Sequence, residues 1–246
     1  RVAIVSGAGA GMGLLTAENL AREGAKVVLA DINLKAVEEA AEAIGRNGGE
    51  AVGVQVDVRE YDQVQQAADL AMDKYGSIDI LMNFAGGAEG RMCHCDKPFH
   101  ELPLEIINWG LDVNLKGAVY FCRAVLGTML KQKRGVIINL GSVSGILGAP
   151  MGVNYSASKS GMIGLTKSLA LCGAPHGVRA CCVSPGPVLT RKEMAKLRTP
   201  LGRAADPQEV VDLILFLTSD KAAFITGNNY IIDGARSLAP VYEELK

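Results

Sequence analysis

Short runs of apolar, largely β-branched residues alternate along this chain with longer stretches of helical periodicity. The strand-like runs cover residues 2–7, 26–31, 51–57, 78–86, 136–142, 178–186 and 229–234. Amphipathic stretches cover residues 13–24, 34–49, 61–76 and 207–219, and a further helix is predicted around Tyr155. The strand-like runs are almost continuously apolar, as in a parallel sheet that helices cover on both faces. We therefore predict an α/β fold with one doubly wound, mostly parallel sheet of about seven strands.

No linker, repeat or low-complexity tract interrupts this alternation, so residues 1–246 are expected to form a single domain. Apolar residues make up 49% of the chain, which is enough for a sizeable core. The 25 basic and 26 acidic residues give a net charge of −1, so no basic field favours nucleic acid or membrane as a partner. No apolar run approaches the ~20 residues that span a bilayer, and no leader-like segment is visible. A cytoplasmic, soluble protein is expected.

Six cysteines raise the question of a metal site. In "MCHCD", Cys93, His94 and Cys95 are potential soft-metal ligands, with His100 nearby. Cys-x-Cys lacks the usual spacing of a zinc site and no second ligand pair follows, so we expect a loop and no metal. The other four lie in apolar stretches, where cysteine packs as a small hydrophobic residue: Cys122, Cys172, Cys181 and Cys182.

Two irregular segments interrupt the alternation. Residues 86–103 form a long loop after the fourth predicted strand, and residues 190–203 form a shorter bridge after the sixth. Ligands of doubly wound sheets bind at the carboxyl ends of the strands. Both segments leave the sheet at that edge, so both are expected to shape a substrate pocket.

The stretch "SGAGAGMG" (residues 6–13) follows the first predicted strand and opens the first helix. A glycine-rich turn there lets backbone N–H groups and the helix N-terminus approach a pyrophosphate, which predicts a dinucleotide-binding loop. Asp31 ends the second strand, where a carboxylate accepts hydrogen bonds from the adenosine ribose and repels a 2′-phosphate. The neighbouring Ala10 and Ile32 supply no cation, so NAD is favoured over NADP. Asp31 is equally able to cap the helix that begins near Asn33.

The stretch "NYSASKSGM" (residues 154–162) suggests acid/base chemistry. Tyr155 and Lys159 stand at i and i+4, so a helix places both side chains on one face. A phenol titrates near ~10, and an ammonium beside it favours the phenolate and lowers its pKa. We therefore expect Tyr155 to exchange a proton near neutral pH.

Taken together, these motifs resemble the short-chain dehydrogenase/reductase family over nearly the whole chain. Phe84 departs from the family's pattern, which has a second asparagine there, and the cysteine-bearing stretch matches no family motif. The residues that carry the resemblance occur in the family's order: Gly7, Gly11, Met12 and Gly13 in the glycine-rich loop; Asp57 and Val58 after the third strand; Asn83, Ala85 and Gly86 in "NFAG"; Asn114 in "VNLKG"; Ser142 in "GSVSG"; Tyr155 and Lys159; and Pro185, Gly186, Val188 and Thr190 in "PGPVLT".

The resemblance implies a role for each of four residues in hydride transfer between NAD(H) and a secondary alcohol or ketone. Tyr155 would be the general acid/base, and Lys159 would lower its pKa and bind the nicotinamide ribose. Ser142 would polarise the substrate oxygen, and Asn114 would hold a water that connects Lys159 to solvent. The remaining motif residues, with Asp31 and Ile32, would line the cofactor site.

The resemblance also implies a homo-oligomer, most often a tetramer, because the family's Tyr-bearing helix often lies at a subunit interface. Here that helix is slim, with small residues such as Gly161 and Gly164. Two other functions stay open. One is an NADPH-dependent 3-oxoacyl-carrier-protein reductase, against which Asp31 argues. The other is a dinucleotide-binding sensor without catalysis, which would need none of the four catalytic residues.

Overall fold

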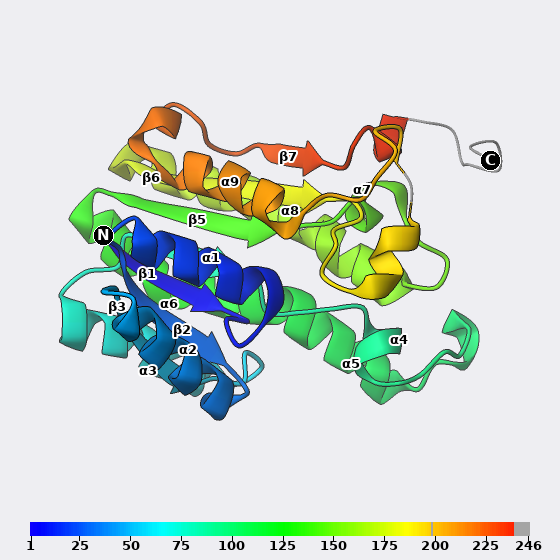
Figure 1. The fold of residues 1–246 in the computed structure, drawn as a ribbon, viewed down its shortest axis with the longest axis horizontal. Coiled ribbons are helices and arrows are strands. Elements are labelled where there is room, and N and C mark those ends of the chain that lie inside the picture. Colours follow the sequence, from blue (N-terminus) through cyan, green and yellow to red (C-terminus); the bar gives the residue numbers. More distant parts are fainter. Residues whose placement is uncertain (198, 239–246) are drawn as a thin grey trace.

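The computed structural model describes residues 1–197 and 199–238, and its centre is one sheet of seven parallel strands (Figure 1). The strand order is β3-β2-β1-β4-β5-β6-β7, with the switch point between β1 and β4. This confirms the predicted doubly wound α/β fold. The strands are β1 (Val2–Ser6), β2 (Lys26–Asp31), β3 (Glu50–Gln55), β4 (Ile80–Asn83), β5 (Gly135–Leu140), β6 (Val178–Pro185) and β7 (Asn229–Ile232).

Helices cover both faces of this sheet (Figure 1). One core cluster joins the sheet to α1, α2 and α9, and a second joins the opposite face to α3, α6 and α8. The strands are apolar throughout because both of their faces are covered. The helices of eight or more residues are α1 (Gly11–Arg22), α2 (Leu34–Arg46), α3 (Tyr61–Tyr75), α5 (Leu104–Leu111), α6 (Gly117–Gln132), α8 (Val153–Gly173) and α9 (Pro207–Thr218).

Helix ends follow the local sequence. Asp206 caps α9 by accepting a hydrogen bond from the Gln208 N–H. The Glu209 carboxylate accepts in turn from the Asp206 N–H, which completes a capping box, and Pro207 occupies the first helical position. Gly76 ends α3 with a φ of 76°, a left-handed conformation that glycine adopts without strain. These signals explain why α9 begins at Pro207 and why α3 ends at Tyr75.

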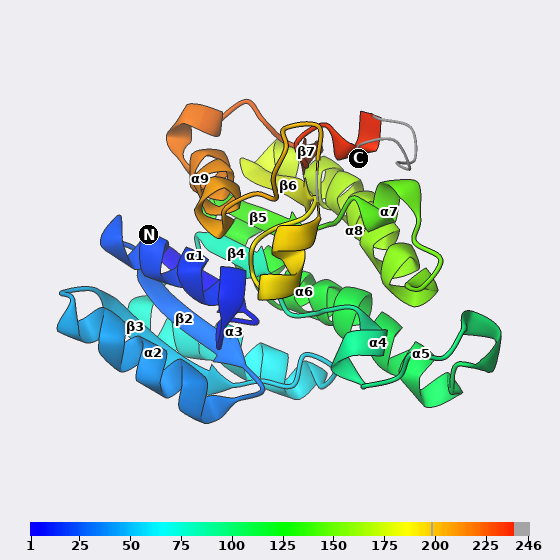
Figure 2. The ribbon, with the colours of Figure 1, turned by 45° about the vertical axis from the view of Figure 1, so that its right-hand side comes forward.

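The irregular segments differ from simple loops. Residues 86–103 contain the four-residue helix α4 (Glu89–Met92) and a 3₁₀ turn at Phe99–Glu101, and residues 190–203 contain a 3₁₀ turn at Lys192–Lys196. Figures 1 and 2 both show α4 and the 192–196 turn near each other beyond the carboxyl ends of the strands. Another short helix, α7 (Ser144–Leu147), follows β5 and packs against α8.

The cysteine prediction needs one correction. Cys122, Cys181 and Cys182 are buried, as expected, but Cys172 is exposed in the last turn of α8. Its neighbours in sequence are apolar, yet this helix turns Cys172 and Leu171 toward the surface. Over the described residues, no helix has both the length and the apolar character needed to cross a membrane.

Candidate active site

A cleft of about 770 Å³ lies at the carboxyl edge of the sheet, around the switch point between β1 and β4. It extends from Asp31 and Ile32 at one end to Ser142 and Tyr155 at the other. A cavity of similar volume, 780 Å³, lies at the opposite edge, where Arg1 and residues 134–136 line it. Ligands of doubly wound sheets bind at the carboxyl edge, so the first cleft is the candidate active site.

The glycine-rich loop takes a shape that side chains would block. Gly7 has a φ of 68°, and a Cβ there would lie 2.7 Å from the Ala85 nitrogen. A Cβ on Gly13 would lie 2.1 Å from the Gly7 carbonyl oxygen. Gly11, with a φ of 60°, has open space on its Cβ side. Together with Met12 these glycines line the cleft, so bare backbone at the start of α1 faces the space that a pyrophosphate would need.

Asp31 ties the end of β2 to the glycine-rich loop. Its carboxylate accepts hydrogen bonds from the Gly9 N–H at 2.9 Å and from the Asn33 N–H at 3.0 Å. The residue that caps α2 is Asn33, whose side chain accepts from the Ala36 N–H. Ile32 is 60% exposed beside the carboxylate. Asp31 therefore orders the loop and leaves a negative, cation-poor surface at this end of the cleft.

Asp57 and Val58 line the same end, two and three residues beyond the end of β3. The Asp57 carboxylate pairs with Arg59, whose Nε lies 2.9 Å from Oδ1. This hydrogen bond lowers the pKa of Asp57. Arg59 is thus neutralised within the chain, which matters for the charge that a cofactor would meet.

Two predicted site residues lie behind the cleft instead of lining it. Asn83 donates from Nδ2 to the Asn139 Oδ1 at 2.8 Å, beneath the sheet edge. Asn114 is 1% exposed and lies in a π-helical turn (Asp112–Lys116) between α5 and α6. The other predicted cofactor residues line the cleft: Gly7, Gly11, Met12, Gly13, Asp31, Ile32, Asp57, Val58, Ala85, Gly86, Tyr155, Lys159, Pro185, Gly186, Val188 and Thr190.

Asn114 fastens the 86–103 segment to the helical layer. Its Oδ1 accepts from the Gly87 N–H at 2.8 Å, and its Nδ2 donates to the carbonyls of Gly87 at 3.0 Å and Gly110 at 2.9 Å. Gly86 permits this approach, because a Cβ there would lie 2.4 Å from the Asn114 Oδ1. In this structure the amide therefore positions backbone, and its predicted water contact stays a prediction.

Ser142 and Tyr155 approach each other at the far end of the cleft. Ser142 follows β5 and is 9% exposed, and its Oγ accepts from the Ser144 N–H at 3.1 Å. Tyr155 lies in the first turn of α8 and is half-buried. Burial raises the pKa of Tyr155, against the lowering effects of a hydrogen bond with Ser142 and the charges of Arg91 and Arg191.

Lys159 is 3% exposed, and its Nζ donates to the Leu140 carbonyl at 2.7 Å. The Nζ lies 5.6 Å from the centre of the Tyr155 ring, so both side chains share one helix face as predicted. Burial lowers the pKa of Lys159 to about 8. The prediction that Lys159 lowers the pKa of Tyr155 is wrong for this arrangement, where the net shift of Tyr155 is upward and desolvation is the largest cause.

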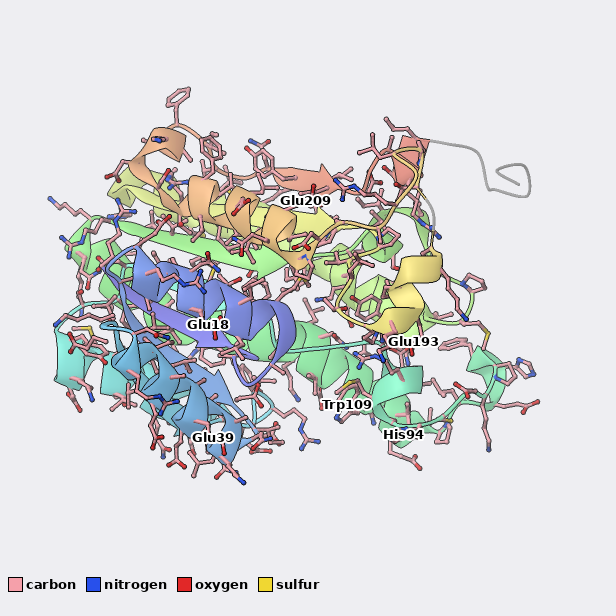
Figure 3. The ribbon with its side chains drawn as sticks, viewed as in Figure 1. Glu18, Glu39, His94, Trp109, Glu193 and Glu209 are labelled. Carbon is pink, nitrogen blue, oxygen red and sulfur yellow. The ribbon has the colours of Figure 1, made fainter. Side chains whose placement is uncertain are left out.

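The substrate end contains residues that the sequence patterns did not identify. Trp109, which Figure 3 labels, comes from α5 and lies there. The only sequence signal for these positions was their location on the two irregular segments or beside them. The further lining residues at this end are Arg91, Met92, Val113, Arg191, Met194 and Leu197.

The cysteine-bearing stretch lies outside this cleft. Its residues His94 and Cys95 line a separate pocket of about 500 Å³ formed with α4 and Met151. Within residues 1–197 and 199–238, no three His, Cys, Asp or Glu side chains are grouped so as to hold a metal ion.

The parallel sheet, the glycine-rich loop at its switch point and the Ser142, Tyr155 and Lys159 cluster define a dinucleotide-dependent oxidoreductase. The family model described as short chain dehydrogenase matches residues 1–200. The chain therefore belongs to the short-chain dehydrogenase family, which uses a nicotinamide dinucleotide.

Relatives with different substrates are similar over nearly the full length. A 3-oxoacyl-[acyl-carrier-protein] reductase of Synechocystis sp. is 40% identical, covering 95% of this chain and 96% of the relative. A cyclohexanol dehydrogenase of Acinetobacter sp. is 35% identical, covering 96% and 94%. A cis-4-hydroxycyclohexanecarboxylate dehydrogenase of Sinomonas cyclohexanicum is 36% identical, covering 95% of each chain.

Proposed function

We propose that this protein oxidises a secondary alcohol, or reduces the matching ketone, with NAD(H) as cofactor. One observation carries the proposal: Ser142, Tyr155 and Lys159 line one end of the cleft whose other end is formed by Asp31 and Ile32. This arrangement fits a dinucleotide that extends from its adenosine at Asp31 to its nicotinamide at Tyr155.

Charge at the adenosine end supports NAD. The Asp31 carboxylate is held in place by two backbone N–H groups, so it would face a 2′-phosphate with a fixed negative charge. The nearby guanidinium of Arg59 is already paired with Asp57. A 2′-phosphate would therefore lose its water at this end without gaining a free cation.

The catalytic step follows from the positions of three side chains. When bound, the nicotinamide would accept the hydride from the alcohol carbon. Ser142 would hold the substrate oxygen at the phenol of Tyr155, which takes the hydroxyl proton as the carbonyl forms. Lys159 would bind the nicotinamide ribose with its ammonium. Asn114 would not contact the substrate. It would hold the backbone of Gly87, which lines the cleft.

A second candidate is an NADPH-dependent 3-oxoacyl-carrier-protein reductase. The 40% identity to a relative of that name favours it, and the carboxylate at Asp31 opposes the cofactor it would use. The two candidates differ in cofactor and in substrate size, so a single assay separates them.

The test is a spectrophotometric screen of secondary alcohols, ketones and a 3-oxoacyl thioester with NAD(H) and NADP(H). We expect turnover of alcohols with NAD, and a loss of about 10²–10⁴-fold in kcat in the Tyr155→Phe variant, because a general acid/base contributes that much. Ile163→Val, on the same helix outside the cleft, is the matched control. A Tyr155→Phe enzyme with near wild-type rates would exclude Tyr155 as the acid/base and point to a different group. No turnover by the wild type with any pair of substrate and cofactor would favour the sensor.

We also propose a homotetramer in the cytoplasm. Gly164 supports an interface on α8, since the space beside it is open. Gly161 serves the chain's own packing instead, because a Cβ there would lie 2.8 Å from the Leu115 Cδ2.

A further inference from the structure

Two arginines lie at the substrate end of the cleft. Arg91 comes from α4 in the 86–103 segment, and Arg191 comes from the residue just before the 192–196 turn. Both line the cleft together with Ser142 and Tyr155. Their charges reach the reacting centre, since each lowers the pKa of Tyr155.

The described part of the chain gives neither arginine an acidic partner. Arg91 makes no hydrogen bond or ion pair with the described residues, and Arg191 reaches only the Met194 Sδ, at 3.1 Å. Six other arginines of the described residues have carboxylate partners: Arg1, Arg22, Arg46, Arg59, Arg134 and Arg203. Arg179 donates to backbone carbonyls instead, and Arg123 stacks on the Tyr61 ring. Arg91 and Arg191 therefore differ from Arg59, which also lines the cleft, in having no carboxylate partner among the described residues.

The negative charge of the cleft lies at its other end. Its acidic lining residues are Asp31 and Asp57, beside the glycine-rich loop and β3. Glu89 is also near Tyr155, but this residue is 3% exposed and does not line the cleft. Its Oε2 makes no hydrogen bond to the described residues. Burial and the charge of Arg191 both lower the pKa of Arg91. Both side chains are exposed at the cleft, and two guanidiniums whose positive charges disfavour each other attract an anion.

We propose that Arg91 and Arg191 bind the carboxylate of the substrate, which makes the substrate a hydroxy acid or the matching oxo acid. This inference rests on the proposed function and adds the chemical class of its substrate. Guanidinium forks match the two oxygens of a carboxylate. Met92, Trp109 and Met194 line the space around the arginines, so the carbon frame between carboxylate and carbinol would be apolar.

The carboxylate takes no part in the bond changes. The C–H bond of the carbinol would break with transfer of its hydride to the oxidised cofactor, and the O–H proton would pass to the Tyr155 phenolate as the C=O bond forms. The carboxylate enters and leaves as an anion, so none of its own bonds changes. Binding energy at this remote group helps to align the carbinol for hydride transfer.

The cofactor pyrophosphate is the other anion that could reach these arginines. The glycine-rich loop already faces it with backbone N–H groups, and the arginines lie at the Tyr155 end. We therefore assign them to the substrate. Kinetics that separate the KM of the substrate from that of NAD distinguish the two assignments.

The experiment uses 4-oxopentanoate and its methyl ester as probes, with binding read from the fluorescence of Trp109. This is the only tryptophan in the chain and it lines the cleft, so binding is measured without turnover. We expect the acid to bind at least about 10-fold more tightly than the ester. Arg91→Gln and Arg191→Gln should each weaken the acid by about 10-fold and leave the ester unchanged.

The control is Arg123→Gln on α6, whose guanidinium stacks 4.4 Å from the Tyr61 ring centre, outside the cleft. It should bind the acid as the wild type does. Equal binding of acid and ester, or of acid to wild type and both Gln variants, would overturn the inference. A rise in the KM of NAD with unchanged acid binding would reassign the arginines to pyrophosphate. Failure of every alcohol in the NAD screen would refute the proposed function, while the fluorescence comparison would still decide the anion site.

Discussion

Asn114→Ala is the substitution that best separates a structural from a proton-carrying role at this site. The amide makes three hydrogen bonds, two to Gly87 and one to Gly110, all between 2.8 and 3.0 Å. It is thereby the polar clamp that holds the start of the 86–103 segment against the π-helical turn. Alanine would keep the helix and remove the clamp.

The expected cost follows from what each partner can do afterwards. Gly87 lines the cleft, so its N–H and carbonyl can turn to water, and each lost bond costs about 0.5–1.5 kcal/mol. Gly110 is buried, so its carbonyl loses the Asn114 hydrogen bond without easy access to water, a penalty of about 1–3 kcal/mol. We expect the free energy of unfolding to fall by about 2–6 kcal/mol in total.

The assay combines urea unfolding with steady-state kinetics. The 86–103 segment supplies Arg91 and Met92 to the substrate end, so a loosened segment should raise the KM of the substrate more than that of NAD. Asn19→Ala is the matched control. Asn19 also makes three hydrogen bonds, to Leu15 and Gln208, on a part of α1 outside the cleft. The control should lose stability and keep both KM values.

Two results would refute this reasoning. If Asn114→Ala unfolds at the wild-type urea concentration, the three hydrogen bonds do not hold the segment. If kcat falls while stability and both KM values are unchanged, Asn114 acts in proton transfer, as the resemblance to the family implies.

Three further predictions concern the cofactor, the buried lysine and the assembly. Asp31→Ala combined with Ile32→Arg should move the ratio of kcat/KM from NAD toward NADP, because it removes the carboxylate and adds a cation; an unchanged ratio would contradict the assignment of Asp31. Burial lowers the pKa of Lys159 from 10.5 to about 8. Below pH 8 the buried ammonium therefore destabilises the folded state by up to about 3 kcal/mol. This destabilisation disappears as the pH rises toward 10.5, because the folded protein then holds the neutral amine. Lys159→Met should therefore gain stability over the wild type most at pH 7 and least at pH 10 in urea titrations, and a difference that does not change with pH would contradict a lowered pKa. Light scattering at micromolar concentration should give about four times the 25.9 kDa chain mass, and a monomer alone would exclude the tetramer.

Much of the fold was predictable because its elements are coded locally. The apolar runs around β1, β2 and β5 are continuous, since helices cover both faces of the sheet. The glycine-rich turn and Asp31 follow from strand ends and helix starts, which short sequence signals mark well. The predicted strands correspond to all seven strands of the sheet.

The helices from residue 104 to 132 were not predicted. The π-helical turn at Asp112–Lys116 inserts an extra residue into the helical register, so the apolar positions of α5 and α6 do not follow one 3.6-residue period. Asn114 lies in this turn, where its side chain reaches Gly87. The π-helical turn that disrupts the sequence pattern of the helices therefore also positions Asn114.

The charge around Tyr155 shows why spacing alone could not predict the site's electrostatics. An i and i+4 spacing places Lys159 near the phenol, but the Leu140 carbonyl, which comes from β5, decides where the ammonium points. Burial then raises the pKa of Tyr155, and the groups that oppose this are Ser142 and two arginines from distant segments. A phenolate usable near neutral pH therefore depends on positive charge assembled by the tertiary fold. If Arg91 and Arg191 supply part of it, a bound carboxylate would cancel that part, and the pH at which alcohol oxidation rises should be higher for a hydroxy acid than for its neutral ester.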